Sequence, residues 1–587
     1  MPDAPNSNAL WGYLVVEECR RNGITLFVIS PGARSTPLTV AAARNPGITI
    51  QMCIDERAAA FYALGYGRAT GKAAALVCTS GTALANYFPA VVEASQSDIP
   101  LLVLSADRPA ELLEAGANQA IRQQQLFGGY VRWFFELPAP GPAIDPAVVL
   151  TTVDQLCYRS RAPHPGPVHL NCPFREPLVE GRQPQLPPIA ELLRPWQSAS
   201  SPFSHYLHPE KTAFADSDLF TGLQNPHGIL IAGELRDARE GRAVLSLAEK
   251  LGWPVLADVL SGLRLASHPH LIYYADQLLQ SKSFQASFRP EVVVQFGGKL
   301  VSKRIQAFAD RMETGQYWRV HPGPQRLDPG HRVTRRIAAN ALDFSNALAD
   351  SRNTIDAAGE WLAHWRAADR IAGETIDTVL ATSPDINEAL LARRISHLLS
   401  AESALFLAAS MPVRDMDMFA APHSGPTRVA ANRGASGIDG TVASAAGFAR
   451  GSGLPTVLCI GDLALLHDLN SLALLSDHQP AVTVVVINNG GGGIFHFLPV
   501  AELEDVFEKH FGTPHALTFR HAALQFGLNY LAPQSMAAFN EAFTSAQSSG
   551  RPGIIEIKTD RKENADLHFA LRQAIQDALQ LFCAGRP

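Results

Sequence analysis

Short β-rich runs of apolar residues recur along this chain, and helical stretches separate them. In the first part, strand signals lie at 24–30 (ITLFVIS), 73–81 (AAALVCTSG) and 99–107 (IPLLVLSAD). A helical stretch at 56–71 lies between the first two and ends on Gly71. Alternation of strand and helix predicts a parallel sheet covered by helices, which is an α/β fold. Functional residues in such sheets gather in the loops that follow the strands.

The same alternation returns twice further along the chain. A second group of strand signals lies at 228–234 and 291–298, before a charged helical stretch around 350–385. A third group follows, with strand signals at 404–410, 455–462, 481–489 and 553–558. Each group therefore predicts its own parallel sheet flanked by helices.

The three groups predict three tandem domains. The 587 residues exceed one ordinary domain of ~150 residues. Between the first two groups, residues 180–205 are rich in Pro, Ser and Gln and predict a linker. We predict an α/β protein with domains at residues 1–185, 205–355 and 375–587.

The composition excludes several classes of function. The 49 Lys and Arg and the 55 Asp and Glu give a net charge of −6 at pH 7, so no global basic field attracts nucleic acid. The first residues do not form a signal peptide, and no apolar run reaches the ~18–20 residues needed for membrane insertion. The seven cysteines are scattered, odd in number and without a CxxC pair, which indicates reduced thiols in a cytoplasmic protein.

Polar residues follow two predicted strands of the third domain. One strand ends in Gly-Asp at Asp462, and 24 residues separate Leu463 from the Asn488-Asn489 pair and the glycine run 490–493. Neighbouring parallel strands would bring this acid and amide to one sheet edge, where their oxygens and a backbone carbonyl suit Mg²⁺. The glycines would let backbone N–H groups approach phosphate oxygens. The alternative is that Asp462 only caps a helix and that the glycines form a turn.

This pattern resembles the GDG and NN signature of thiamine-diphosphate enzymes, with Leu463 in place of the third signature residue. The resemblance implies that Asp462, Asn489 and the carbonyl of Gly491 bind Mg²⁺ or Mn²⁺, which holds thiamine diphosphate. It also implies a glutamate from the first domain that promotes the imino tautomer of the cofactor. Glu56 matches this position, although a structural alternative is that it complements a helix dipole. In these enzymes the first domain of one subunit meets the third of another, which implies a homodimer or homotetramer with active sites at the subunit interface.

Longer stretches narrow the resemblance. They are SPGARSTPL (30–38), the segment 55–95, SADRPAELLEAGANQAI (105–121), ANRGASGIDGTVASAAGFA (431–449), GDLALLHDLNSLALL (461–475) and NNGGGGIFHFLP (488–499). Together they resemble the 2-succinyl-5-enolpyruvyl-6-hydroxy-3-cyclohexene-1-carboxylate synthases, the MenD family of menaquinone and phylloquinone biosynthesis. The resemblance implies decarboxylation of 2-oxoglutarate and 1,4-addition of the resulting carbanion to isochorismate.

Both implied substrates are dicarboxylates, and the planar guanidinium of Arg pairs bidentately with a carboxylate. The resemblance implies that isochorismate faces Arg34, Arg108, Gln119, Lys303 and Arg304. It implies that the carboxylate of the 2-oxoglutarate-derived part is held by Ser410, Arg414 and Arg433, with Ser410 also near the cofactor. The alternative for each arginine is a surface salt bridge.

Apolar residues complete the implied site. Ile438 matches the residue that wedges thiamine into its bent conformation, and an apolar wall near the reaction centre matches Ile494, Phe495 and Leu498. For these the alternative is ordinary core packing. Three departures from the family pattern leave the fine substrate contacts open: Ala33, Ala409 and Gly493. We interpret His467 and His496 as structural.

Other functions compete with this interpretation. An acetolactate-synthase-type 2-oxoacid decarboxylase would share Glu56 and the metal motif but would not need the longer stretches. A nicotinamide or flavin oxidoreductase would need a GxGxxG loop, which residues 227–240 lack, so we interpret the middle domain as a Rossmann-like scaffold without its own cofactor. A non-catalytic binding protein would not need intact Glu56, Asp462 and Asn489.

Overall fold

A computed structural model describes residues 4–178, 193–206, 223–311, 315–349, 359–383, 385–422 and 428–585. Contacts divide the chain into two compact units. The first unit comprises Met1–Glu210, Asn432–Gly453 and His467–Gln479. The second comprises Lys211–Ala431, Leu454–Leu466 and Pro480–Pro587.

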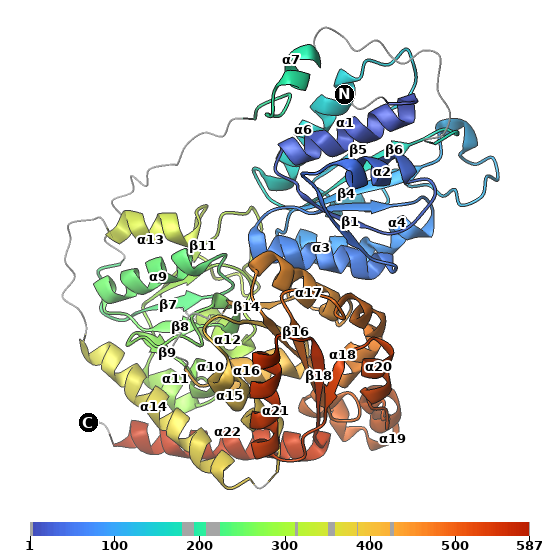
Figure 1. The fold of residues 1–587 in the computed structure, drawn as a ribbon. Helices are drawn as coiled ribbons and strands as arrows, with labels where there is room; N and C mark the ends of the chain where they lie inside the picture. Colours follow the sequence, from blue (N-terminus) through green and yellow to red (C-terminus); the bar gives the residue numbers. More distant parts are fainter. Residues whose placement is uncertain are drawn as a thin grey trace. The chain divides into compact units, whose positions relative to one another are not determined.

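The first unit is built on a sheet of six parallel strands in the order β2-β1-β3-β4-β6-β5 (Figure 1). The strands are β1 (Leu26–Ile29), β2 (Thr49–Met52), β3 (Ala75–Cys78), β4 (Leu101–Asp107), β5 (Trp133–Glu136) and β6 (Pro167–Pro173). Strands β1, β3, β4 and β6 are buried along their whole length, as expected where helices cover both faces of a parallel sheet.

Helices cover both faces of this sheet (Figure 1). One face carries α1 (Ser7–Arg21), α2 (Thr36–Arg44) and α6 (Ala147–Arg161), and the other carries α3 (Glu56–Thr70), α4 (Thr82–Asn86) and α5 (Phe88–Gln96). Short 3-10 turns are η1 (Ala110–Leu112), η2 (Gly128–Tyr130) and η4 (Leu469–Leu474). Helix α17 (Thr441–Ser452) packs closely on α3, because a Cβ at Gly65 would lie 2.0 Å from the carbonyl oxygen of Ser444.

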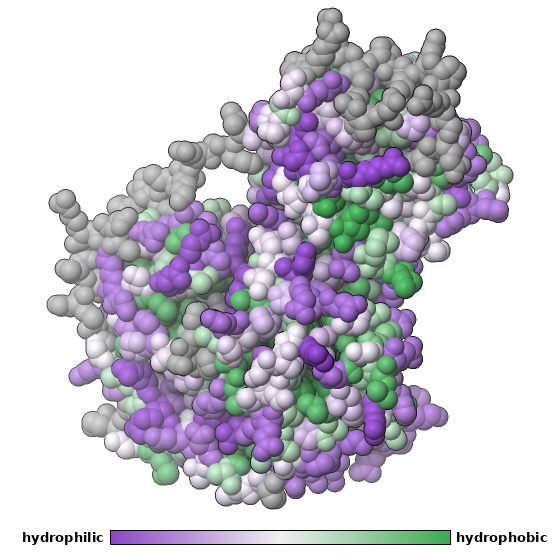
Figure 2. All heavy atoms as spheres, in the orientation of Figure 1, coloured by the Kyte–Doolittle hydropathy of each residue, from purple (hydrophilic) through white to green (hydrophobic). Residues whose placement is uncertain are grey.

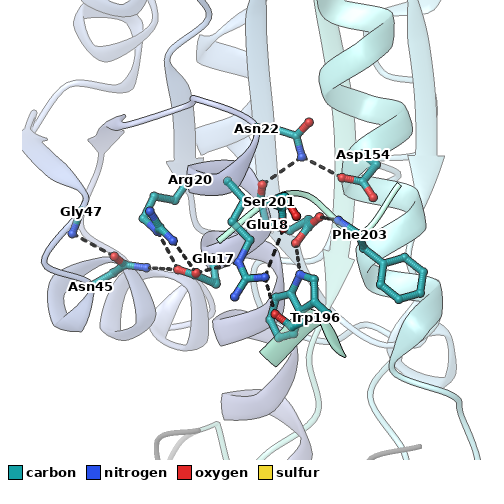
Figure 3. Close-up of polar contacts among 11 residues, drawn as sticks. Glu17, Glu18, Arg20, Asn22, Asn45, Gly47, Asp154, Trp196, Ser201 and Phe203 are labelled. Carbon is teal, nitrogen blue, oxygen red and sulfur yellow. Dashed lines mark hydrogen bonds and ion pairs between the residues drawn. The ribbon is translucent and has the colours of Figure 1, made fainter. Parts of the chain in front are cut away.

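Part of the predicted linker belongs to the first unit. Helix α7 (Leu193–Ser198) buries Trp196, whose indole N–H donates to the Glu18 carboxylate at 2.6 Å. The backbone N–H of Phe203 donates to the same carboxylate at 2.6 Å, and Figure 3 shows Glu18 between these two donors. The linker prediction is therefore wrong for residues 193–205, because the indole of Trp196 and the backbone of Phe203 both donate to a buried acid of the first unit. The rest of the predicted linker and the boundaries at 185 and 355 lie outside the described residues.

The second unit contains two further sheets, each of six parallel strands. The first sheet follows the order β12-β11-β10-β7-β8-β9, which is the doubly wound order of Rossmann folds. Its strands are β7 (Gly228–Ala232), β8 (Val255–Ala257), β9 (Leu271–Ile272), β10 (Val292–Phe296), β11 (Gln316–Val320) and β12 (Arg335–Ile337). At its switch point the loops pack together, because a Cβ at Gly297 would lie 2.3 Å from the carbonyl oxygen of Glu234.

The other sheet has the order β14-β13-β15-β16-β18-β17, which repeats the topology of the first unit. Its strands are β13 (Ala404–Leu407), β14 (Arg428–Ala431), β15 (Thr456–Gly461), β16 (Val482–Asn488), β17 (Asn529–Leu531) and β18 (Gly553–Lys558). The predicted α/β fold with three parallel sheets flanked by helices is thus confirmed.

Helices surround both sheets of the second unit (Figure 1). They are α9 (Ala238–Leu251), α10 (Ala275–Leu278), α11 (Lys282–Ser287), α12 (Lys303–Asp310), α13 (Ala341–Ala349), α14 (Gly359–Ala381), α15 (Glu388–Leu398), α16 (Met411–Phe419), α18 (Asp462–His467), α19 (Glu504–Phe507), α20 (Arg520–Gln525), α21 (Met536–Ser549) and α22 (Arg561–Ala584). Shorter turns are η3 (Val259–Ser261), η5 (Gly493–Phe497), η6 (Pro499–Glu502) and η7 (Glu508–Gly512). Helices α14 and α22 lie side by side in one core, so the C-terminal helix packs on the middle segment.

Candidate active site

The acid and the amide of the cofactor motif leave one sheet edge, as predicted. Strands β15 and β16 pair in parallel with Gly461 opposite Ile487, so the residues that follow them are neighbours. The carboxylate of Asp462 is buried and accepts from the backbone N–H of Leu463 at 2.6 Å and from that of Gly491 at 3.0 Å. Burial raises the pKa of Asp462. A buried carboxylate here favours a bound cation as its counter-charge.

The amide of Asn489 supplies a second oxygen. Its Nδ2 donates to the Glu388 carboxylate at 2.9 Å, while its Oδ1 is buried and accepts no hydrogen bond in the described part of the chain. A buried acceptor without a partner is costly, and a cation would satisfy it. Within the described ranges no three His, Cys, Asp or Glu side chains form a metal cluster, so a site here depends on mixed oxygen ligands. Asp462, Asn489 and the Gly491 carbonyl fit the oxygen ligands of Mg²⁺ or Mn²⁺.

The N–H groups of the glycine run have hydrogen-bond partners within the chain. The N–H of Gly490 donates to Asn488 Oδ1, that of Gly491 to Asp462, that of Gly492 to the Gly512 carbonyl and that of Gly493 to the Gly491 carbonyl. The phosphate cradle at these N–H groups therefore stays a prediction. The backbone packs closely here: Gly491 has φ +147°, and a Cβ there would lie 2.1 Å from the Gly512 carbonyl oxygen.

Two departures from the family pattern have local explanations. Leu463 is the second residue of helix α18, where helical dihedral angles suit any side chain. Gly493 lies against the Asn489 amide, because a Cβ there would lie 2.7 Å from Asn489 Nδ2. A larger residue at this second position would displace that amide, which the sequence did not reveal.

Glu388 is a residue of this site that the sequence analysis missed. It opens helix α15, is buried, and accepts from Asn489 at 2.9 Å and from Thr559 Oγ1 at 3.1 Å. Burial and the nearby Asp415 raise its pKa to about 8. Its contact with Asn489 spans 101 residues of sequence, so the only local signal was an acid in the first turn of a helix. His515 was also missed, and its Nε2 lies 3.3 Å from Asp462 Oδ2.

A cationic cluster lies at the carboxyl edge of the sheet in the first unit. The guanidinium of Arg108 donates to Ser80 Oγ, and this hydroxyl donates to the carbonyl of Gln119 at 3.0 Å. Burial lowers the pKa of Arg108, and the positive charge of Arg34 lowers it further. Arg34 is buried and donates to the Phe174 carbonyl at 3.0 Å and to an exposed carboxylate, Glu176, at 2.8 Å. The structure thus brings Arg108 and Gln119 together at one hydroxyl, with the charge of Arg34 close to Arg108.

Glu56 is the first residue of α3, but it is not the helix cap. Asp55 is the N-cap and accepts from the backbone N–H groups of Arg57 and Ala58. The negative charge of Glu56 raises the pKa of the buried Cys78 thiol beyond the effect of burial, so the two side chains lie near each other. Asp55 thus caps the helix, while Glu56 is the acidic residue of its first turn, where it also complements the helix dipole.

The loop that carries Arg433 and Ile438 is anchored within the first unit. The buried carboxylate of Glu93 accepts from the backbone N–H groups of Gly434 at 2.7 Å and Ala435 at 2.6 Å, and from Arg68 at 3.1 Å. Ile438 remains 37% exposed, which is unusual for a large apolar residue in a well-anchored loop. Glu93 was not predicted from the sequence, because its motif does not indicate a contact with a loop 341 residues further along the chain.

The remaining predicted residues lie in the second unit. Ser410 precedes α16 with φ +74°, a strained conformation, and its carbonyl accepts from Arg414. Lys303 is exposed at the start of α12, whereas Arg304 forms an ion pair with Asp276 at 2.5 Å.

The predicted apolar wall lies in the 3-10 turn η5 and just after it rather than in an α-helix. Ile494 and Phe495 are half-buried, and the ring of Phe495 packs edge-on against Phe511 with centroids 5.7 Å apart. Leu498 is 46% exposed. These side chains are available to a ligand without being part of the core.

Comparisons with known proteins agree with this arrangement. A family model described as "Thiamine pyrophosphate enzyme, N-terminal TPP binding domain" matches residues 11–126. A second, "Middle domain of thiamine pyrophosphate", matches residues 188–407, and "Thiamine pyrophosphate enzyme, C-terminal TPP binding domain" matches residues 415–557.

Curated relatives match almost the whole chain. A protein of Rubrobacter xylanophilus named 2-succinyl-5-enolpyruvyl-6-hydroxy-3-cyclohexene-1-carboxylate synthase is 48% identical, over 97% of this chain and 98% of its own. Proteins of the same name from Salinibacter ruber and Chlorobaculum parvum are 42% and 45% identical, over 98% and 96% of this chain and over 98% and 96% of their own. Every helix in the described segments is too short or too polar to cross a membrane.

Proposed function

The chain belongs to the 2-succinyl-5-enolpyruvyl-6-hydroxy-3-cyclohexene-1-carboxylate synthase family of thiamine-diphosphate enzymes, and from this premise we propose how its residues perform the reaction. The resemblance predicted from the motifs is confirmed, and the chain is a transferase of menaquinone biosynthesis rather than an acetolactate-synthase-type enzyme. The reaction joins the succinyl unit of 2-oxoglutarate to isochorismate and releases CO₂. The observation that carries the proposal is the near-complete match to relatives of this name.

The protein uses thiamine diphosphate, and Mg²⁺ or Mn²⁺ would join the cofactor to the third sheet. Asp462, Asn489 and the Gly491 carbonyl would hold the ion. The Oδ1 of Asn489 supports this assignment, because this buried oxygen accepts a hydrogen bond from no donor in the described part of the chain. When bound, thiamine diphosphate supplies the nucleophilic carbon and the electron sink for loss of CO₂.

Glu56 would hold the proton that the aminopyrimidine ring exchanges. Asp55 caps the helix, so the Glu56 carboxylate can serve this purpose without loss of helix stability. Proton transfer by a positioned side chain contributes roughly 10²–10⁴-fold to a rate. Ile438, exposed on an anchored loop, would support the bent conformation of the cofactor.

Cationic groups would bind the substrate carboxylates. Arg34, Arg108 and Gln119 would bind isochorismate, since two neighbouring arginines suit a carboxylate better than either alone. The proposed isochorismate set also includes Lys303 and Arg304, although Arg304 has an acidic partner.

The 2-oxoglutarate carboxylate would be bound by Ser410, Arg414 and Arg433. Ile494, Phe495 and Leu498 would exclude water from the reacting atoms, which strengthens electrostatic interactions there.

We also propose a homodimer or homotetramer in the cytoplasm. Beside Glu56, the side chains of Met52 and Ile54 are 51% and 88% exposed, and large apolar side chains at a site favour coverage by a second subunit. Figure 2 shows further hydrophobic patches on a mostly hydrophilic face. All seven cysteines are free thiols, as expected in a reducing compartment.

Release of CO₂ from 2-oxoglutarate tests the proposal. Purified protein with thiamine diphosphate and Mg²⁺ is assayed with and without isochorismate. We expect turnover that depends on isochorismate. Release that is indifferent to isochorismate would instead identify a simple 2-oxoacid decarboxylase, and no release would reject 2-oxoglutarate as the substrate.

A further inference from the structure

A buried glutamine of the first unit, Gln123, connects three strand ends of the sheet. Its Oε1 accepts from the backbone N–H of Gly81, which follows β3, at 2.9 Å. Its Nε2 donates to the carbonyl of Ala106 on β4 at 3.2 Å and to Asn171 Oδ1 on β6 at 2.9 Å. The side chain is fully buried, and both its donor and its acceptor groups are used. A satisfied buried amide of this kind fixes the relative positions of the groups it joins.

The Gly81 contact holds a turn whose Ser80 hydroxyl accepts from Arg108 of the cationic cluster. Gly81 has φ +89° and ψ −145°, a conformation that glycine adopts far more readily than other residues. Because the backbone of glycine is also free to leave this conformation, the hydrogen bond from Gly81 to Gln123 helps to fix the turn. The preceding residue, Ser80, accepts from Arg108 and donates to the carbonyl of Gln119. A Cβ on Gly81 would lie 2.9 Å from Gln119 Cγ, so the turn and Gln119 are in close contact. A shift of Gly81 would therefore move the Ser80 hydroxyl on which Arg108 and Gln119 converge.

A second connection runs from Gln123 to Arg108 through buried polar groups. Asn171 accepts from Gln123 and donates to Asp107 Oδ2 at 2.8 Å. The other oxygen of Asp107 accepts from the backbone N–H of Arg108 at 2.7 Å. Asn171 Oδ1 also accepts from Ser105 at 2.8 Å, so this amide has a single orientation. Two separate connections thus join Gln123 to one substrate-binding arginine.

We propose that Gln123 is a positioning residue for the isochorismate site, acting through Gly81 on one side and through Asn171 and Asp107 on the other. The inference rests on the proposed function, because it assigns Arg108 and Gln119 to isochorismate. Gln123 does not touch the substrate. Its loss should weaken isochorismate binding and leave the 2-oxoglutarate half of the reaction intact.

Steady-state kinetics of Gln123→Met test this role. Methionine has a similar shape but neither donates nor accepts, so it removes the three hydrogen bonds while keeping the volume. We expect KM for isochorismate to rise about tenfold, which corresponds to ~1.4 kcal/mol, with KM for 2-oxoglutarate within about twofold of wild type. The matched control is Gln547→Met: this half-buried glutamine of α21 in the second unit donates to Thr483 Oγ1 at 3.3 Å and belongs to neither connection. Its KM for isochorismate should stay near the wild-type value.

A milder variant, Gln123→Glu, keeps the role testable if Gln123→Met does not fold. In Gln123→Glu a carboxyl group buried near Asp107 is favoured in its protonated form, so it still accepts from Gly81 and donates one hydrogen bond. We expect a rise of about threefold in KM for isochorismate, and thermal melting reports whether each variant is folded. An unchanged KM for isochorismate in the folded variants, or an equal rise for both substrates, would overturn the role of Gln123. Wild-type CO₂ release without dependence on isochorismate would overturn the proposed function itself, which separates the two failures.

Discussion

Gly493 is the position where one methyl group should weaken metal binding. A Cβ at this residue would lie 2.7 Å from Nδ2 of Asn489 and 3.5 Å from its Cγ. Nonbonded atoms approach to roughly 3.5 Å, so in Gly493→Ala the amide must retreat by roughly 0.8 Å. The same amide nitrogen donates to Glu388 at 2.9 Å. A retreat of this size lengthens or rotates the hydrogen bond that fixes the orientation of Oδ1, the proposed metal ligand.

The expected loss of metal affinity is estimated from other proteins in which a hydrogen bond to a metal ligand has been removed. Loss of a hydrogen bond that orients a metal ligand costs roughly 10–100-fold in metal affinity. We therefore expect the Kd for Mn²⁺, measured by electron paramagnetic resonance of free Mn²⁺ in the presence of thiamine diphosphate, to rise by about this factor in Gly493→Ala.

Gly129→Ala is the matched control, because a Cβ there meets nothing within 4 Å. Its Mn²⁺ affinity and melting temperature should equal those of wild type. If folded Gly493→Ala protein binds Mn²⁺ as tightly as wild type, then either the metal does not use Asn489 or the amide does not depend on its orientation, and the reasoning fails.

Further substitutions test other parts of the site. Glu56→Gln should keep thiamine diphosphate affinity but lower turnover by roughly 10²–10⁴-fold, because only proton transfer is lost; near-wild-type turnover would exclude the assigned role. Arg414→Lys and Arg433→Lys should each raise KM for 2-oxoglutarate about tenfold through loss of bidentate pairing, and unchanged values in both would reject this carboxylate clamp. Glu388→Ala leaves the metal-site amide without its acceptor and should lower Mn²⁺ affinity about tenfold or more, whereas equal affinity would make this acid purely structural. Burial raises the pKa of Glu18 to about 8. The folded state therefore binds this proton more tightly than the unfolded state, and the resulting stabilisation is complete below the pKa of an ordinary glutamate and is lost as pH rises through about 8. Urea unfolding at pH 6 and pH 9 should therefore show a smaller fall in stability for Glu18→Gln than for wild type; equal falls would contradict this.

Some of the site followed from local patterns of residues. Strands β15 and β16 are continuous apolar runs, so their ends and the polar residues after them could be located from the sequence. Their parallel pairing then brought Asp462 and Asn489 together, as expected for neighbouring strands. The motif that carries Glu56 likewise placed it at the start of a helix, where the structure has it.

Other contacts depend on residues that are distant in sequence. Glu388 reaches Asn489 across 101 residues, and Glu93 reaches Gly434 across 341. Neither acid has a periodic or spaced motif that points to its partner. The same limit explains the error over Trp196, since a Pro- and Ser-rich composition does not reveal that one indole N–H meets a buried carboxylate.

The sequence by itself determined the α/β class, the three groups of strands and the positions of the acid and amide after two of those strands, because hydrophobic periodicity and turn residues act over a few positions. Only the tertiary structure decided that the first and third sheets along the chain share one strand order while the second has the Rossmann order. It also decided that the glycine N–H groups are used internally and that Gly493 makes room for Asn489. Strand order and close packing depend on which distant segments of the chain meet. That pairing is determined by the summed free energy of many contacts across the chain, and no short motif encodes it.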